Sequence, residues 1–235
     1  MRLVLTSDIH GNLFDPDIVE AGDVLIIAGD VCPDYQFARS VDAQREWIRS
    51  EFIPWVKQID VSLVLATWGN HDWYGEHCYR RHHAGVDPEI AALLPQHVKF
   101  LTDSSYLLPD GTKVYLTPWQ PEFCGWAFNA LDTVDSLGTK FAEIPEDTEV
   151  LVVHGPPFGY GDRVWQPGRD RVGSKELLMR LNRLPSLRLV VCGHIHESYG
   201  SYQHVTPTGR KIDIVNVSRC DRLRMPNNPL VYWKL

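Results

Sequence analysis

The sequence predicts an α/β fold, and three features of the chain carry this prediction. Short apolar runs rich in valine, isoleucine and leucine recur along the chain, and stretches with helical periodicity lie between them. Several runs are apolar throughout, as is typical of strands covered on both faces of a sheet. Polar residues follow many of the runs directly, which is where ligands bind in open α/β sheets.

The expected strands are the apolar runs themselves. In chain order they are "RLVLTS" (2–7), "DVLIIA" (23–28), "VSLVLA" (61–66), "KVYLT" (113–117), "EVLVV" (149–153), "RLVVC" (188–192), "KIDIVNV" (211–217) and "PLVYW" (229–233).

Two helices are expected between these strands. The first begins near Phe37 and runs to Val56, with apolar residues at helical spacing, and Pro54 is expected to end or kink it. The second, "SKELLMRLNRL", has Ser174 as its N-cap and stops before Pro185.

Bulk composition places the chain among ordinary globular proteins. Hydrophobic residues make up 44% and charged residues 23% of 235 residues, without a repeat or a Gly/Ser-rich linker, so a single domain over residues 1–235 is expected. The net charge of −7 disfavours long nucleic acid as a partner. The N-terminal apolar stretch is too short for a signal peptide and no run approaches about 18 apolar residues, so no membrane partner and a cytoplasmic location are expected.

Five of the runs deliver Asp, Asn or His at their exits. These residues are Asp8, His10, Asp30, Asn70, His71, His154, His194 and His196. If the strands are parallel neighbours, their carboxyl ends converge on one crevice and the polar side chains share one site. Each aspartate alone is more often a turn residue, whereas His194 and His196 alternate in an extended segment and so face the same side.

The chemistry of this set suits divalent cations. Carboxylate, amide and imidazole donors without thiolates fit Mn²⁺, Fe²⁺, Zn²⁺ or Ni²⁺. The donors exceed what one tetrahedral ion needs, so a two-metal site bridged by one carboxylate would use them all.

Together the motifs resemble one family. "SDIHG" (7–11), "GD" (29–30), "GNHD" (69–72), "VVHGPP" (152–157) and "GHIH" (193–196) are similar to the calcineurin-like metallophosphoesterase superfamily. The stretches 117–129, 154–162 and 192–200 resemble its metallophosphoesterase-domain-containing branch, related to class III cyclic-nucleotide phosphodiesterases. The resemblance implies a four-layer αββα sandwich of two mixed β-sheets, with a dinuclear metal site at the C-terminal edge of the strands.

The resemblance also implies a role for each residue. Asp8, His10, Asp30 and His196 would hold one ion; Asp30, Asn70, His154 and His194 would hold the other, with Mn²⁺ favoured. His71 would act as general acid on the leaving group after attack by a hydroxide that bridges the ions. Asp72 would either orient the His71 imidazole or close the turn, and both interpretations stay open.

The expected activity is hydrolysis of small phosphodiesters, with cyclic nucleotides such as 2′,3′-cyclic AMP among the candidates. A phosphomonoesterase, a nuclease of the same superfamily and a non-catalytic metal-binding module are the alternatives, and the oligomeric state is left open. Candidate substrate contacts are Trp73, Tyr74, Arg163 and His204, and the aromatic insert around Trp119 and Trp126 could stack on a base or fill the rim.

Overall fold

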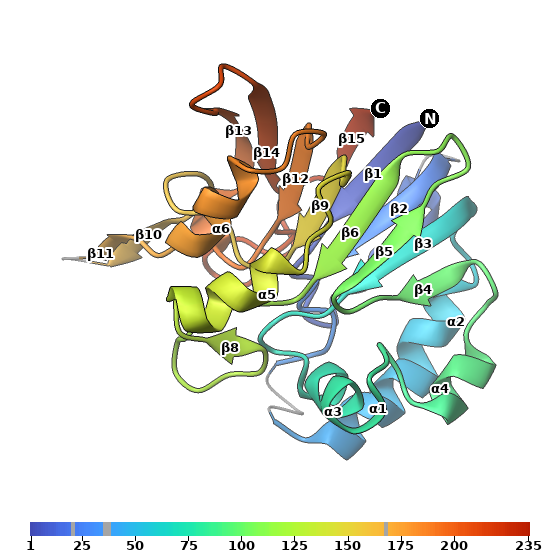
Figure 1. Cartoon of the computed structure of the whole chain (residues 1–235). Helices are drawn as coiled ribbons and strands as arrows, with labels where there is room; N and C mark the ends of the chain where they lie inside the picture. The colour runs from blue at the N-terminus through green and yellow to red at the C-terminus, as the bar shows by residue number, and fades with distance from the viewer. Residues whose placement is uncertain (20–21, 35–38, 167–168) are drawn as a thin grey trace.

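Two mixed β-sheets form the centre of the molecule. The computed structural model describes residues 1–19, 22–34, 39–166 and 169–235. The first sheet has the strand order β15-β1-β2-β3-β4 and the second β13-β14-β12-β9-β6-β5 (Figure 1). The first comprises β1 (Arg2–Thr6), β2 (Gly22–Ala28), β3 (Val61–Thr67), β4 (Val98–Phe100) and β15 (Val231–Lys234). The second comprises β5 (Ser104–Leu107), β6 (Lys113–Thr117), β9 (Val150–Val153), β12 (Leu189–Cys192), β13 (Gly200–Val205) and β14 (Lys211–Asn216).

Parallel pairing runs through the middle of both sheets. β1, β2, β3 and β4 pair in parallel, as do β14, β12, β9 and β6. Antiparallel strands lie at three of the edges: β15 beside β1, β13 beside β14, and β5 beside β6. Each expected strand is confirmed, and the parallel pairing brings the predicted site residues to one side of each sheet.

Alternating residues of the strands fill two apolar layers. Leu3, Leu5 and Ile26 belong to the cluster between the sheets, together with Val150 and Val152 of the second sheet. The intervening residues point the other way and pack in the cluster that includes the helices. Burying one such side chain stabilises the fold by roughly 1.5–3 kcal/mol, so the period of two along each strand fixes the order of the layers.

Helices cover the outer faces of the sheets and complete the four-layer sandwich. Figure 1 shows one group near β3 and β4 and another beside the second sheet. The first group is α1 (Val41–Trp47), α2 (Ile53–Val56), α3 (Trp73–His82) and α4 (Pro88–Leu93), and the second is α5 (Thr139–Ala142) and α6 (Lys175–Leu181). The expected second helix is confirmed as α6, where the Ser174 hydroxyl accepts the N–H of Leu177 at 3.0 Å.

The expected first helix differs in detail. Its predicted start at Phe37 lies outside the described residues; the described helix begins at Val41, and Ser40 caps it. A π-helical turn over Ile48–Phe52 separates α1 from α2, and the helix continues past Pro54 to Val56. The proline ring would clash with a backbone carbonyl of the preceding turn in a regular α-helix, and the wider π turn makes room for it. Pro54 therefore alters the helix and does not end it.

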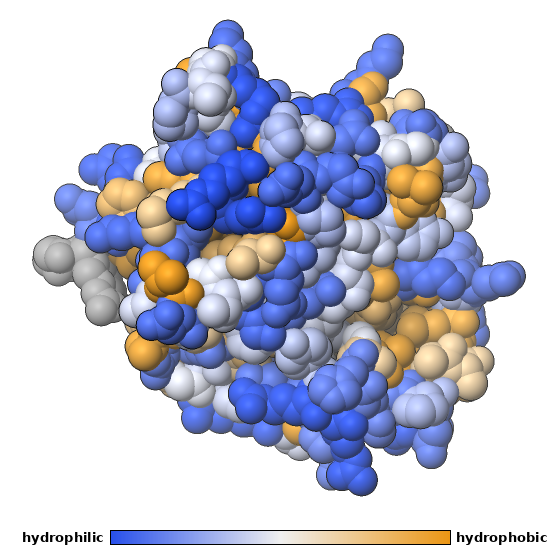
Figure 2. All heavy atoms as spheres, in the orientation of Figure 1, coloured by the Kyte–Doolittle hydropathy of each residue, from blue (hydrophilic) through white to orange (hydrophobic). Residues whose placement is uncertain are grey.

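Shorter elements complete the chain. They are β7 (Gln120–Pro121), β8 (Asn129–Ala130), β10 (Arg163–Gln166), β11 (Arg169–Arg171), the 3₁₀ turns Pro16–Ile18 and His196–Ser198, and the π turn Val134–Gly138. Across the part of the chain that the structure describes, no helix combines the length and apolarity needed to cross a bilayer. The face in Figure 2 is mostly hydrophilic, and its apolar residues form separate groups.

Candidate metal centre and its cleft

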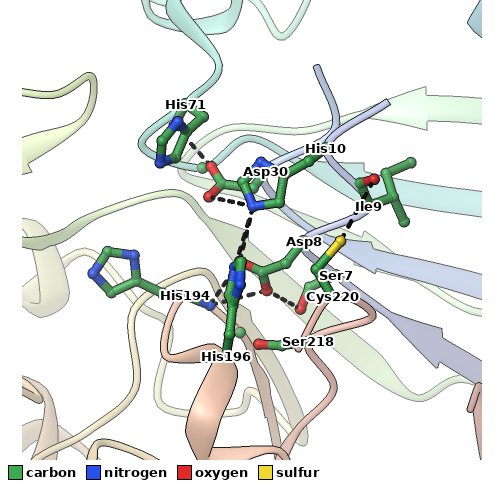
Figure 3. Close-up of polar contacts among 12 residues, drawn as sticks. Ser7, Asp8, Ile9, His10, Asp30, His71, His194, His196, Ser218 and Cys220 are labelled. Atoms are coloured by element: carbon green, nitrogen blue, oxygen red, sulfur yellow. Dashed lines mark hydrogen bonds and ion pairs between the residues drawn. The ribbon is translucent and has the colours of Figure 1, made fainter. Parts of the chain in front are cut away.

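The predicted ligands meet at the strand ends of both sheets. Asp8 and His10 follow β1, Asp30 follows β2 and Asn70 follows β3. His154 follows β9 in the second sheet, and His194 and His196 follow β12. Figure 3 shows several of these side chains converging from different strand ends. The sequence-based prediction that these exits share one site agrees with the geometry.

One group of donors lies around His10 and His196. Their Nε2 atoms are 3.1 Å apart, and Asp8 Oδ1 lies 3.2 Å from His196 Nε2. Asp30 Oδ2 lies 3.7 Å from His10 Nε2. These atoms are close enough to share one cation.

A second group lies on the other side of Asp30. Asp30 Oδ2 is 3.4 Å from His154 Nε2, which is 3.0 Å from Asn70 Oδ1. His194 Nδ1 lies 2.7 Å from the same amide oxygen. Asp30 is therefore the residue that both groups share, as a bridging carboxylate requires.

The hydrogen bonds behind the rings show that these groups suit cations. The carbonyl of Ala28 accepts the Nδ1 proton of His154 at 2.9 Å, and that of Asp221 accepts the Nδ1 proton of His196 at 3.1 Å. In the neutral imidazole the Nε2 atoms then carry lone pairs, and they face the carboxylate, amide and imidazole acceptors of the site. Acceptors that face one another without a donor are stabilised by a metal ion, and the carbonyls that fix the tautomers support metal ligation.

The pKa values of the histidines in the site also indicate that it suits a divalent cation. Burial lowers the pKa of His154, but Asp30, Asp8 and the Ala28 carbonyl together outweigh it and raise the pKa to about 9. Burial likewise opposes the effect of Asp8 on His196, whose pKa is raised to about 9. His10 and His194 have pKa values lowered to about 3, chiefly by burial, so both are neutral ligands at physiological pH. A divalent cation would replace the protons that the carboxylates otherwise attract.

The backbone places these donors by unusual conformations and close approach. Asp8, His10, Asp30 and His194 all have positive φ, between 44° and 69°. A Cβ added to Gly69 would lie 2.3 Å from Asp30 Oδ1, and one added to Gly193 would lie 2.1 Å from Asp8 Oδ2. Only glycine leaves room for the carboxylates at these two positions.

His71 faces the cleft beside this centre, and Asp34 holds its ring. His71 Nδ1 contacts Asp34 Oδ1, which also lies 3.2 Å from His10 Nδ1. Arg224 contacts the other carboxylate oxygen of Asp34. Sequence reasoning missed Asp34, although it follows Asp30 on the same strand exit and that proximity was the available signal.

Asp72 closes the turn instead of contacting the imidazole. Its carboxylate is buried and accepts backbone N–H groups of Cys32 at 2.8 Å, Gly69 at 2.8 Å and Val31 at 3.0 Å. These bonds tie the exit of β3 to the exit of β2. Of the two interpretations left open for Asp72, the geometry favours closing the turn, because its oxygens are occupied by the backbone.

An open cleft of about 790 Å³ leads to the centre. Asp30, Asn70, His71, His194 and His196 line it, together with the apolar and charged residues Phe123, Trp126, Phe158, Val164, Trp165, Arg171, Lys175, Arg222 and Arg224. Trp126 packs on His71 with ring centroids 4.3 Å apart. Trp119 is instead buried against Phe128, so the aromatic insert divides between the cleft and the core.

The expected substrate contacts lie elsewhere. Tyr74 is buried and its hydroxyl donates to Asp87 at 2.9 Å, and His204 has one ring nitrogen 3.0 Å from the Tyr160 hydroxyl and the other 2.8 Å from Asn182 Oδ1. Neither these two residues nor Trp73 and Arg163 line the described cleft. The role of these four residues in substrate binding stays a prediction, which the lining of the cleft does not support.

Comparisons with known proteins agree with this geometry. A family model described as Calcineurin-like phosphoesterase matches residues 1–198. Human metallophosphoesterase domain-containing protein 1 is 35% identical over 242 residues, covering 97% of this chain and 69% of the human protein. A UPF0046 protein of Caenorhabditis elegans is 28% identical over 252 residues, covering 99% of this chain and 59% of its own length.

The fold is also found among solved structures. A dimetal phosphatase from Danio rerio superposes with a TM-score of 0.55 at 13% sequence identity, covering 99% of this chain and 91% of the fish protein. The family model spans every strand exit that supplies a donor, and a relative with 35% identity extends over nearly the whole chain. The chain therefore belongs to the calcineurin-like phosphoesterase family.

Proposed function

We propose that this protein is a hydrolase of small phosphodiesters that works with two divalent cations, of which Mn²⁺ is the first candidate. The observation that carries the proposal is the position of Asp30 between two groups of acceptor atoms. Asp8, His10 and His196 would hold one ion with Asp30, while Asn70, His154 and His194 would hold the other. Oxygen and imidazole donors fit Mn²⁺ and also Fe²⁺, Zn²⁺ or Ni²⁺.

Bound cations of this kind polarise phosphoryl oxygens and lower the pKa of water, so that hydrolysis runs at neutral pH. The chain supplies the remaining groups. His71 lines the cleft next to the donors, and the contact of its Nδ1 with Asp34 leaves Nε2 to protonate the departing alkoxide. Asp34 therefore orients the imidazole of His71.

The walls of the cleft favour a diester over a monoester. Phe123, Trp126, Val164 and Trp165 provide apolar surface beside the donors, which suits organic groups on the phosphate. Arg224 contacts Asp34 and Arg171 contacts Asp162, so carboxylates already offset part of the positive charge that would bind a phosphomonoester dianion.

The charge of the chain favours small substrates. The net charge is −7, and Glu122, Asp132 and Glu197 lie along the cleft among its cations. A long polyanion gains affinity from many neutralised phosphates, and this surface offers little neutralisation.

A metal-reconstitution assay tests the proposal. The protein is stripped with a chelator, Mn²⁺ is added back, and initial rates are measured on bis-p-nitrophenyl phosphate and p-nitrophenyl phosphate. We expect metal-dependent diester hydrolysis that exceeds the monoester rate and falls by at least about 100-fold in Asp30→Asn.

The matched control is Asp147→Asn, which changes a carboxylate that is 66% exposed and paired with Lys113. It is expected to keep the parent rate. A higher monoester rate would replace the proposal with a phosphatase, and metal binding without turnover of either ester would favour a binding module.

A further inference from the structure

Two tryptophans, Trp126 and Trp165, line the cleft. Trp126 packs on His71, and the His10 ring lies between His71 and His196, with centroids 5.0 Å and 5.1 Å away. The backbone N–H of Trp165 donates to Glu197, the residue that follows His196. The cleft therefore has one aromatic wall next to the general acid and a second wall whose backbone is held to the loop that carries His196.

The backbone fixes each wall to a loop that carries a ligand. Ala127, the residue after Trp126, donates its N–H to the Asn70 carbonyl at 3.1 Å. The N–H of Arg163 donates to Ser198 Oγ at 2.9 Å, and that of Trp165 to Glu197 Oε1 at 3.3 Å. The backbone at both tryptophans is thus tied to loops that carry candidate metal ligands.

Trp165 is unusually accessible for its type. Its side chain is 74% exposed, although tryptophan is on average a highly buried residue. The guanidinium of Arg222 lies over the ring at 5.1 Å from its centroid. An exposed indole face with a cation beside it, opening into a cleft, is suited to stack a planar group that is linked to a phosphate.

We propose that Trp165 and Arg222 form a subsite for the alcohol that stays on phosphorus, and that the substrates are acyclic phosphodiesters in which this alcohol is a nucleoside. The inference rests on the proposed function and deepens it. In an acyclic diester the leaving alcohol lies on the side of His71 and Trp126, while the retained nucleoside reaches the other wall. A cyclic nucleotide carries both ester oxygens on one ribose and has a single base, so it fills only one wall.

The reaction balances as a simple hydrolysis. The bond between phosphorus and the leaving oxygen breaks, the oxygen of water forms the new bond to phosphorus, and His71 supplies the proton to the leaving alkoxide. The retained nucleoside stays esterified as a monophosphate at Trp165.

Two chromogenic diesters with the same leaving group distinguish the contribution of the Trp165 wall from that of the Trp126 wall. Thymidine 5′-(4-nitrophenyl) phosphate and methyl 4-nitrophenyl phosphate differ only in the retained alcohol, so the difference between their KM values reports on its subsite. We expect the parent protein, loaded with Mn²⁺, to have the lower KM for the thymidine ester. Trp165→Ala should raise that KM about tenfold, with kcat nearly unchanged and the methyl ester unaffected.

Trp165→Phe keeps a stacking face and should recover most of the affinity. Tyr232→Ala removes another exposed aromatic residue, 40% exposed on β15 and outside the cleft lining, and should leave both esters unchanged. Equal KM values of the parent for the two esters, or an equal loss on both in Trp165→Ala, would overturn the subsite.

A binding measurement separates this inference from the proposed function. Calorimetric titration with thymidine 5′-monophosphate and with methyl phosphate does not need turnover. If neither diester is hydrolysed but the nucleotide binds more tightly than methyl phosphate and loses that advantage in Trp165→Ala, the subsite stands and the diesterase proposal fails. If thymidine 5′-monophosphate binds no better than methyl phosphate, the subsite is refuted whatever the rates are.

Discussion

The donor residues occupy backbone conformations that L-amino acids rarely adopt. Asp8, His10 and Asp30 have φ values of 50°, 44° and 52°. A residue in this left-handed region costs about 1–2 kcal/mol, and the neighbouring backbone has to enforce it. The N–H of Asp8 donates to the Gly29 carbonyl at 2.9 Å, and that of His10 donates to the Asp30 carbonyl at 3.0 Å. Backbone hydrogen bonds therefore join the residues that follow β1 to those that follow β2. These bonds offset the free-energy cost of the left-handed conformations.

His71 offers a test of catalysis that is separate from metal binding. Its ring contacts Asp34 and Trp126, and it lies outside the two donor groups around Asp30, although with His10 and Asp34 it forms a third group of close donor atoms. His71→Ala should therefore retain the metals of the parent and lower kcat by about 100–1,000-fold, in the range of general acid catalysis. The measurements are metal content by mass spectrometry and kcat on bis-p-nitrophenyl phosphate. Loss of the metals in this variant would make His71 a ligand and contradict its role as acid.

The sequence predicts the candidate metal ligands better than it predicts the residues around them. Asp30 and His154 could be located because each directly follows an apolar run, and the ends of parallel strands converge. Trp126 was a candidate for the rim, but the contacts of Asp34 and Trp126 with His71 could not be predicted, because they depend on how loops fold over the strand ends. Tyr74, three residues after His71, is buried, because closeness in sequence does not fix the direction of a side chain.

At the scale of elements, Asp87 joins three helices. It caps α4 by accepting the N–H of Glu89 at 2.9 Å, receives the Arg45 guanidinium of α1 at 2.7 Å, and accepts the Tyr74 hydroxyl of α3 at 2.9 Å. Burial raises the pKa of Asp87, but the bond from Arg45 and the helix N–H groups outweigh it and lower the pKa to about 2. The ionised carboxylate is therefore the form that the fold stabilises.

Replacing this carboxylate gives a prediction with a defined pH dependence. A folded pKa below the unfolded value of 3.8 means that the stabilisation is complete above that value and is lost as the pH falls through about 2. Asp87→Asn should lower the free energy of unfolding by about 1–2 kcal/mol at pH 7. Urea denaturation from pH 7 to pH 2 should show the difference from the parent shrinking below pH 4.

Asp135→Asn, an exposed substitution, is the control and should match the parent at every pH. A loss in Asp87→Asn that stays constant down to pH 2 would mean that the charge of Asp87 contributes nothing.

Elements were predictable where apolar periodicity was strong. The strands and α6 show it, whereas α3 buries polar and small residues such as Glu76 and Gly75 on the face toward the core. Glu76 is held there by the N–H of Phe128 at 3.0 Å, a partner distant in sequence. The edge strand β13 was missed because its residues are mostly half-buried or exposed. Contacts between residues distant in sequence determine whether such segments form a helix or a strand, so their local hydrophobic pattern does not predict them.

At the scale of the whole molecule, the metal centre spans the two sheets. Asp8, Asp30 and Asn70 come from the exits of the first sheet, while His154 and His194 come from the second. The sequence predicted the set of donors, but the pairing order of the strands, which places β9 beside β12, is a property of the folded chain. That residues 1–235 form one domain stays a prediction.

Because donors of both sheets share the site, cation binding should stabilise the whole fold. A ligand that binds only the folded state at 100 times its dissociation constant adds about 2.7 kcal/mol, which in a chain of this size raises Tm by about 5–10 °C. We expect this rise when Mn²⁺ is added to chelator-treated protein and followed by differential scanning calorimetry. Asp30→Asn loses the carboxylate common to both donor groups and should show less than half of the shift, whereas His71→Ala should show all of it. If Asp30→Asn shows the same rise in Tm as the parent, the stabilising ions bind away from the strand ends of the two sheets. Among the described donors, Asp30 is the carboxylate that contacts both His10 and His154.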